Sequence, residues 1–260
     1  MNILVCIKQV PDTTEVKLDP KTGTLIRDGI PSIINPDDKA GLEEALKIKE
    51  KTGATVTVIT MGPMQADLAL REAIAMGADK GILLSDRAFA GADTWATSSA
   101  IAGAIKKIDC DLIIAGRQAI DGDTAQVGPQ IPEHLQLPSI TYVEKLEVEG
   151  EHIIVNRSFE DGHQVIKAKM PCLITTLQGM NKPRYMKVGR IYEAFAEDKV
   201  EVWNVNDIEV DRANLGLKGS PTKVKKSFTK GVKAAGEKFE VTPGEGASII
   251  VENLKAKFII

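Results

Sequence analysis

The chain has 260 residues, of which 43% are hydrophobic and 27% are charged, and its formal net charge is −3. These values are typical of a globular protein, and a negative net charge with only 4% aromatic residues argues against a nucleic-acid partner. The apolar runs are too short to span a membrane, the first residues lack the charged region of a signal peptide, and the three cysteines lie in or beside apolar runs, so we expect a cytoplasmic protein with free thiols.

Strand-like and helix-like segments alternate through the first half of the chain. The first predicted helix shows clear end signals, because Asp37 and Asp38 suit its positive N-terminal end and Gly53 suits the position after its last residue. The strand segments are continuously apolar, which indicates a parallel sheet covered by helices on both faces. The predicted strands are residues 3–7, 55–59, 81–84 and 112–115, and the predicted helices are residues 36–52, 64–76 and 94–108, with another beginning between Thr124 and Pro129.

After Pro138 the pattern changes to short strands joined by turns. Gly150 and residues 160–162 are typical of hairpin turns. The strands around them either extend the same sheet with antiparallel members or form a small lobe. The predicted strands here are residues 140–146, 153–159, 164–168 and 172–176.

After Leu177 the sequence shows little regular periodicity of apolar residues. Residues 218–238 are rich in lysine and glycine, and the chain closes with an apolar stripe. Such a tail either wraps loosely around its own chain or packs on a partner, and its composition favours the partner. The stripe consists of Ile249, Ile250, Leu254, Phe258 and Ile259.

Several kinds of chemistry have no motif in this sequence. It contains no Gly-x-Ser-x-Gly elbow, no Walker-A loop and no Gly-x-Gly-x-x-Gly fingerprint. The three histidines, His134, His152 and His163, lack the spacing of a metal site. We therefore expect neither a catalytic side chain nor a bound metal ion.

The most informative segment is the one that runs from Leu112 to Pro129. A predicted strand breaks at Gly116 into a loop of glycines, acids, a hydroxyl and an amide, and a helix follows, an arrangement that places backbone N–H groups around a phosphate. Asp121 and Asp123 suit ribose hydroxyls, and Thr124 suits a phosphate. The alternative is that Gly116 only turns the chain and that Asp123 or Thr124 caps the helix. The other strand ends expected at the same edge of the sheet are residues 6–8 and 60–62. Residues 35–38, which directly precede a predicted helix, are a further candidate part of this site.

Two segments of the chain resemble the beta subunit of electron transfer flavoproteins. They are residues 116–127 and residues 155–166, the latter closed by residues 171–175, and the second fits the family signature at each defined position. Residues 181–185 also match, and the similarity extends from Asn2 to about Arg190. The resemblance implies an α/β fold with a parallel-core, adenine-nucleotide-binding sheet of the Rossmann-like, alpha-hydrolase-like type. It also implies added antiparallel strands and an extended C-terminal arm.

The resemblance further implies a division of the chain and a set of binding residues. Residues 1–190 would form the nucleotide- or flavin-binding domain, and residues 191–260 an arm that packs on an alpha subunit. A docking loop for a dehydrogenase would include Arg184, Tyr185, Met186, Lys187, Val188, Gly189 and Arg190, with Val188 as its apolar anchor. The implied cofactor contacts are Cys6, Asn35, Pro36, Asp37, Asp38, Met61, Gly116, Arg117, Gln118, Ala119, Ile120, Asp121, Gly122, Asp123, Thr124, Ala125, Gln126 and Val127.

Residues 124–129 resemble the electron-bifurcating branch of this family, in which FAD replaces AMP. AMP-binding members typically carry more acidic and amide residues where this chain has Gly122 and Val127. In that branch NADH reduces the beta-subunit FAD. One electron then goes to ferredoxin or flavodoxin, and the other goes through the alpha-subunit FAD to a dehydrogenase of the acyl-CoA or 2-hydroxyacid type.

Two alternatives remain open from the sequence. One is a non-bifurcating subunit with a structural AMP, and the other is a stand-alone nucleotide sensor. Pro132 departs from the alanine expected at its position, and we place it near the first turn of its helix, where proline costs little.

Overall fold

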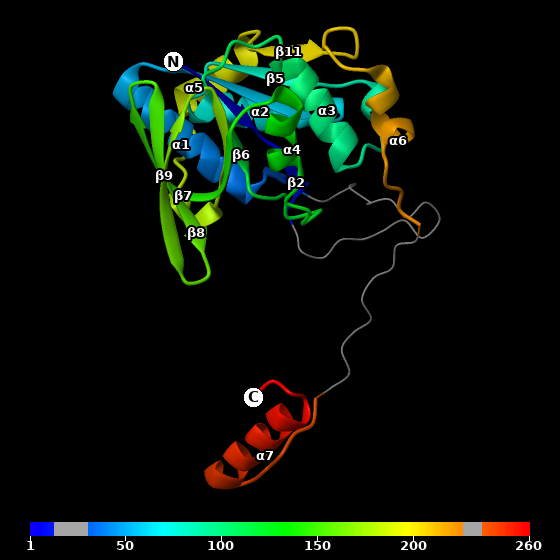
Figure 1. Ribbon diagram of the computed structural model, residues 1–260. Helices are drawn as coiled ribbons and strands as arrows, with labels where there is room; N and C mark the ends of the chain where they lie inside the picture. Colours follow the sequence, from blue (N-terminus) through cyan, green and yellow to red (C-terminus); the bar gives the residue numbers. More distant parts are fainter. Residues whose placement is uncertain (13–30, 226–235) are drawn as a thin grey trace. The chain divides into compact units, whose positions relative to one another are not determined.

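A computed structural model of the chain describes residues 1–12, 31–225 and 236–260 (Figure 1). Its centre is a nine-stranded sheet with the order β11-β5-β4-β1-β6-β10-β7-β8-β9. The first seven strands in this order are parallel, and β8 and β9 continue the sheet in antiparallel pairing. The strands are β1 (Asn2–Cys6), β4 (Thr55–Met61), β5 (Lys80–Leu84), β6 (Leu112–Gly116), β7 (Ser139–Glu149), β8 (His152–Phe159), β9 (Gly162–Lys169), β10 (Cys172–Thr176) and β11 (Val200–Trp203), beside a separate pair of β2 (Gln9–Pro11) and β3 (Ser32–Ile34).

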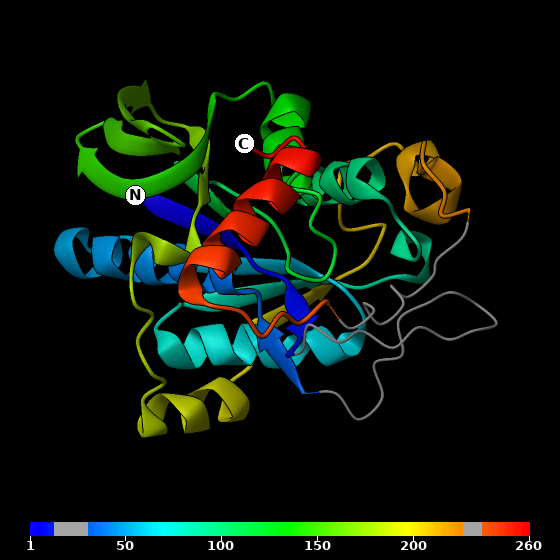
Figure 2. The ribbon, with the colours of Figure 1, turned by 90° about the horizontal axis from the view of Figure 1, so that it is seen from below.

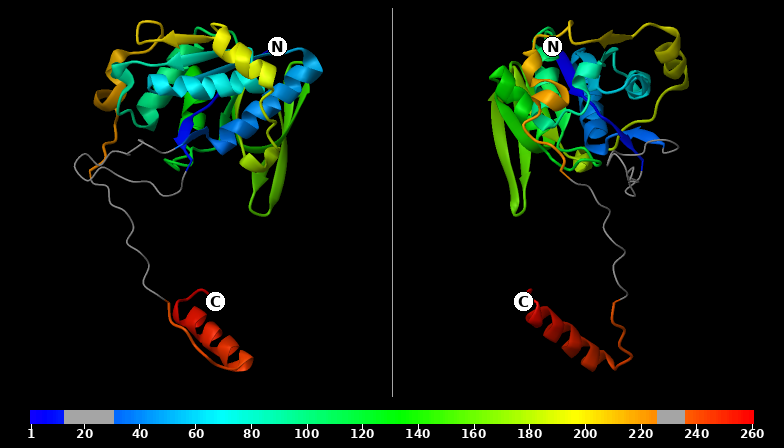
Figure 3. Two further views of the ribbon diagram at one scale, coloured as in Figure 1. Left: turned by 180° about the vertical axis from the view of Figure 1, so that it is seen from behind. Right: turned by 90° about the vertical axis from the view of Figure 1, so that its right-hand side faces the viewer.

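Helices cover both faces of the sheet, as the continuously apolar strands predicted (Figures 2 and 3). Side chains alternate along a strand, so Ile3 and Val5 belong to one hydrophobic cluster and Leu4 belongs to the other. α1 (Pro36–Thr52), α2 (Asp67–Met76) and α5 (Val188–Ala196) pack on the first face, and α3 (Thr94–Ile105) and α4 (Val127–Leu135) pack on the second. Short helical turns are η1 (Met64–Ala66), η2 (Arg87–Phe89), η3 (Gln178–Met180), η4 (Arg212–Asn214) and α6 (Gly216–Gly219).

The helix ends follow the local signals in the sequence. α1 begins with Pro36, carries two acidic residues in its first turn and ends at Gly53, which has φ of 72°. Asp93 caps α3 by accepting a hydrogen bond from the Ala96 N–H at 3.0 Å. α3 ends at Ile105, three residues before the end that the apolar spacing predicted.

The second half of the chain completes the same sheet and does not form a lobe. β10 lies between β6 and β7 and is parallel to both, so only β8 and β9 are added in the antiparallel sense. The hairpin turns at Gly150 and at residues 160–162 are confirmed. Pro132 is inside α4 and not in its first turn, which corrects that expectation.

The chain divides into a compact unit of Met1–Lys225 and a second unit of Lys226–Ile260. The first unit continues past residue 190, the boundary expected from the sequence, because that residue lies within α5 and because β11 pairs with β5. In the second unit the described residues contain α7 (Pro243–Ala256), which begins with a capping box between Thr242 and Glu245. Sequence patterning predicted no helix in this tail.

Candidate functional site

The candidate nucleotide site lies where three parallel strands end side by side. β1 lies between β4 and β6, and Cys6 is opposite Ile59 on one side and Ala115 on the other. The helices that follow β1 and β6 cover opposite faces of the sheet, so these two strands flank the point where the strand order reverses. Ligands of open α/β sheets bind at the carboxyl ends of the strands at this point. The structure therefore brings the predicted Cys6, Met61 and Gly116 to one edge.

Asp38 joins the ends of β1 and β6 at this edge. Its Oδ2 accepts a hydrogen bond from the Lys8 backbone N–H at 2.7 Å, and its Oδ1 accepts one from the Gly116 N–H at 3.0 Å. Burial raises the pKa of this carboxyl to about 7, although the hydrogen bonds it accepts act in the opposite direction. A Cβ at position 116 would overlap Oδ1 of Asp38, so the contact requires glycine.

Asn35 fixes the loop that follows β6. Its buried side chain donates from Nδ2 to the Gln118 carbonyl at 2.8 Å and accepts at Oδ1 from the Ile120 N–H at 3.0 Å. The neighbouring Asp37 accepts from the Gln178 N–H at 2.8 Å. Pro36 is the first residue of α1. Residues 35–38 thus hold the walls of the site in place from the start of α1.

The loop itself is braced by charged and polar contacts. Lys8 Nζ lies 2.7 Å from Asp121 Oδ1, and Gln118 Nε2 donates to Asp123 Oδ1 at 3.0 Å. Asp123 and Ala125 have positive φ values of 48° and 52°, and residues other than glycine rarely adopt this backbone conformation. Non-glycine residues in that region concentrate at ligand sites, where surrounding contacts hold them.

The outer part of the loop is open. Ile120, Gly122, Asp123, Thr124 and Gln126 are exposed, whereas Ala119 is half-buried. α4 starts at Val127 with Gln126 in the capping position and with no side-chain cap, so the alternative in which Asp123 or Thr124 caps this helix is wrong. The start of α4 and the Thr124 hydroxyl remain available to an anionic group.

Cys6 adds a neutral group to the site. Burial, followed by the nearby Asp38 carboxylate, raises the pKa of its thiol. The side chain is therefore a thiol that can pack against a ligand, and it does not serve as a thiolate.

The predicted docking loop for a dehydrogenase lies on the face of the sheet that α1 and α2 cover. The Arg184 guanidinium is not free: its Nε lies 2.9 Å from Glu43 Oε2, and it also pairs with Glu50, so two carboxylates of α1 hold this segment. These contacts raise the pKa of Arg184 and lower that of Glu50. Beyond Arg184 the chain presents apolar side chains to solvent, with Tyr185 at 91% and Val188 at 84% exposure.

α5 extends this exposed surface. Ala194 is buried against α2, and the Arg71 guanidinium lies 5.1 Å from the ring centroid of Phe195. Tyr192 and Phe195 of the same helix remain exposed. We call the exposed side chains of Tyr185, Met186, Val188, Tyr192 and Phe195 the α5 patch. Of the other predicted docking residues, Lys187 and Gly189 are exposed and Arg190 is half-buried.

The described residues contain neither a candidate membrane-spanning helix nor a candidate metal site. Within residues 1–12, 31–225 and 236–260, no helix is both long enough and apolar enough to cross a bilayer. Over the same ranges, no group of three or more His, Cys, Asp or Glu side chains could hold a metal ion.

Comparison with known proteins identifies the family. The family described as Electron transfer flavoprotein domain matches residues 22–208. The chain belongs to the electron transfer flavoprotein family. It is similar to Electron transfer flavoprotein subunit beta of Clostridium acetobutylicum, with 59% identity over 260 residues and 100% of both chains covered.

Two further relatives extend the comparison. Caffeyl-CoA reductase-Etf complex subunit CarD of Acetobacterium woodii is 55% identical over 263 aligned positions, with both chains fully covered. Protein FixA of Azotobacter vinelandii is 47% identical over 236 positions, which cover 88% of this chain and 84% of that protein. These relatives place the chain among the beta subunits of the electron transfer flavoprotein family.

Sequence reasoning missed the contacts that three residues make at this candidate site. Lys8 follows a strand end that the sequence placed at the correct edge, but its pairing with Asp121 spans 113 positions. Thr176 donates from Oγ1 to the Asp37 carbonyl at 3.0 Å. Tyr142 has φ of 60°, and its ring centroid lies 6.0 Å from the Arg117 guanidinium. No local signal in the sequence indicates these contacts.

Proposed function

We propose that this electron transfer flavoprotein chain binds FAD in the loop of residues 116–127 and takes electrons from NADH. In this proposal it pairs with an alpha subunit and bifurcates the electrons. One electron passes to ferredoxin or flavodoxin, and the other passes through the FAD of the alpha subunit to an acyl-CoA or 2-hydroxyacid dehydrogenase. The observation that carries the proposal is the braced but open loop at the strand switch point.

The residues present fit a dinucleotide. Thr124 and the uncapped start of α4 suit a pyrophosphate, and Asp121, although paired with Lys8, keeps acceptor capacity for a ribose hydroxyl. Asp38 and Asn35 hold the loop and need not touch the ligand. The flavin would supply the hydride and one-electron chemistry, while the protein contributes position and electrostatics.

The preference for FAD over AMP rests on space at two positions. A Cβ built at Gly122 meets no atom within 4 Å, so no other part of the described chain occupies the space beside this position. Val127, at the start of α4, adds an apolar surface where an acidic or amide side chain would favour a smaller polar ligand. The names of relatives that belong to reductase complexes agree with a role in electron delivery.

Cofactor analysis of the purified complex tests the proposal. We expect two FAD molecules for each alpha–beta pair and no AMP. One FAD with one AMP would instead establish the non-bifurcating alternative and overturn the bifurcating proposal.

A further inference from the structure

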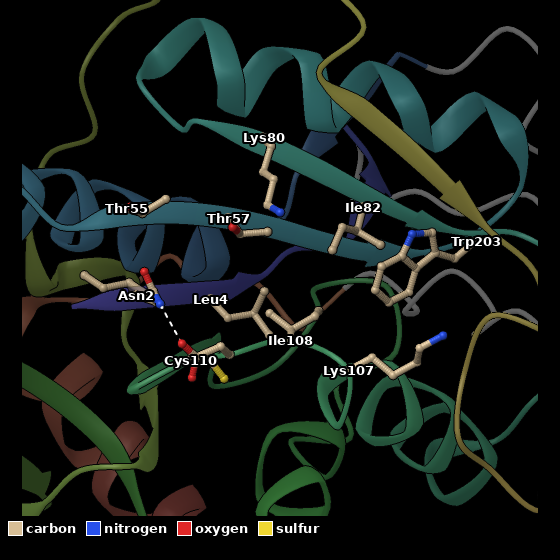
Figure 4. A pocket seen from close by; sticks show the side chains of 12 residues that line it. Asn2, Leu4, Thr55, Thr57, Lys80, Ile82, Lys107, Ile108, Cys110 and Trp203 are labelled. Atoms are coloured by element: carbon tan, nitrogen blue, oxygen red, sulfur yellow. Dashed lines mark hydrogen bonds between the residues drawn. The ribbon is translucent and has the colours of Figure 1, made fainter.

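A cavity on the second face of the sheet lies outside the nucleotide site. Its volume is about 270 Å³, and its floor is formed by the amino-terminal halves of β1, β4 and β5 (Figure 4). It lies beyond the end of α3 at Ile105, where residues 107–110 line it in place of a helix. Thr55 is exposed although it lies in a strand of the central sheet.

The cavity carries an excess of positive charge. Lys80 extends over the floor from β5, and Lys107 lies on the opposite wall (Figure 4). Within residues 1–12, 31–225 and 236–260, neither ammonium group lies within 4.0 Å of a carboxylate oxygen. The lining contains one carboxylate, Asp109, which accepts a hydrogen bond from Asn2 Nδ2 at 3.2 Å. Two lysines and one aspartate leave a net charge of +1.

The rest of the lining suits an apolar body with a few polar anchors. Leu4 and Ile82 form a buried floor, and Thr57 among them is 6% exposed. Trp203 forms one wall, with the Lys107 ammonium 5.8 Å from its ring centroid and its own indole N–H directed to Glu201. Burial raises the pKa of the Cys110 thiol to about 11, so this side chain is uncharged at neutral pH.

We propose that this cavity binds a small monocarboxylate with a compact apolar or aromatic body. The carboxylate would lie between Lys80 and Lys107, and the body would rest against the half-buried Ile108 and Trp203, above the buried Leu4 and Ile82. Pockets for drug-sized ligands occupy about 300–1,000 Å³, so a cavity of about 270 Å³ selects something smaller. A monoanion also neutralises the excess charge of the lining, whereas a dianion would reverse it.

Benzoate is the test ligand, and neutral benzamide is its matched control. The full-length chain contains two tryptophans, Trp95 and Trp203, so 5-fluorotryptophan labelling gives two fluorine NMR signals, which Trp95→Phe assigns. We expect benzoate to shift the Trp203 signal saturably without moving the Trp95 signal. Lys80→Gln should weaken benzoate binding about tenfold, because it removes one charge-assisted hydrogen bond. Lys167→Gln, an exposed lysine on β9, should leave the binding unchanged.

Calorimetric titration provides a measurement independent of the fluorine label, which matters for Lys107→Gln because that residue contacts Trp203. Equal binding of benzamide, an unchanged affinity in both Lys80→Gln and Lys107→Gln, or no saturable signal would overturn the proposal. Loss of benzoate binding when the alpha subunit is added would also overturn it, since the cavity would then be an interface between subunits.

Discussion

A single carboxylate, that of Asp38, connects the two strands that flank the nucleotide site. Its two oxygens accept from backbone N–H groups that are 108 residues apart in the chain, those of Lys8 and Gly116. A buried N–H without an acceptor costs free energy, so both groups depend on this side chain. Asp38 therefore determines the spacing of the strand ends between which a ligand would enter.

Replacing Asp38 with asparagine should destabilise the protein. Asparagine offers one acceptor oxygen, and its amide N–H group would face one of the two backbone donors, so we expect the free energy of unfolding to fall by about 1–3 kcal/mol. Urea unfolding at neutral pH measures the change. An unchanged midpoint and slope would show that the two N–H groups do not depend on Asp38.

The same carboxyl group predicts a pH dependence of stability. Its pKa in the folded chain is about 7, above the ordinary value of 3.8, so the folded state holds this proton to higher pH than the unfolded state does. The stabilising contribution is complete below the unfolded pKa and is lost as the pH rises through about 7. Between about pH 5 and about pH 8, the unfolding free energy of Asp38→Asn should therefore decline less than that of the unsubstituted chain. Parallel pH profiles for the two proteins would contradict the assignment.

Thr124→Trp tests the open side of the loop. Thr124 is exposed, so a larger side chain should be compatible with folding but should occupy the space of the proposed pyrophosphate. We expect the purified complex to lose the beta-subunit flavin and to keep the alpha-subunit flavin, as measured by flavin absorbance per protein. Lys169→Trp, at an exposed position on β9, is the control and should retain both flavins. An unchanged flavin content in Thr124→Trp would count against this site.

Among the elements, α1 supports both predicted sites. Its first turn carries Asp37 and Asp38 at the nucleotide edge, and its later turns carry Glu43 and Glu50, which hold Arg184. Glu43 is buried, so its pairing with Arg184 is protected from the solvent that weakens surface ion pairs. The resemblance implied that Arg184 belongs to the docking loop for a dehydrogenase, whereas in the structure its guanidinium pairs with Glu43 and Glu50 of α1.

The α5 patch is the element that we expect to contact the dehydrogenase. Val188→Glu would place a charge at its apolar centre, where association requires desolvation, so electron transfer to the dehydrogenase should fall at least about tenfold. NADH oxidation with an artificial acceptor should remain unchanged. Val224→Glu is a matched control, because Val224 is 85% exposed and Val188 is 84% exposed. Equal effects of the two substitutions on electron transfer would contradict the proposed docking role of this patch.

At the level of the whole chain, we expect the boundary between the two units to separate folding from association. Residues 1–225 form a compact unit with its own sheet and both hydrophobic clusters. The described part of the second unit contains α7, which has no buried residue, and exposes Ile250, Phe258 and Ile259. Apolar side chains on an unburied helix are typical of a surface that packs on another protein.

Ending the chain after Lys225 should leave the first unit folded. We expect its melting temperature to change by less than about 4 °C, because no buried core residue is removed. Co-purification with the alpha subunit should be lost. A shortened chain that unfolds, or one that still retains the alpha subunit, would contradict this division of roles.

The sequence by itself determined the strands of the central sheet from β1 to β10 and the helices α1 to α4, because their signals are local, whereas α5, β11 and α7 were not predicted. Continuous apolar runs predicted the parallel strands, and Asp93 and Gly53 marked a helix start and a helix end where the structure has them. The tertiary structure alone decided that β10 lies between β6 and β7, that Asp38 joins β1 to β6, and that Arg184 is held by α1. Asp38 and Gly116 are 78 positions apart and Arg184 and Glu43 are 141 apart, and neither periodicity nor capping carries information over such separations.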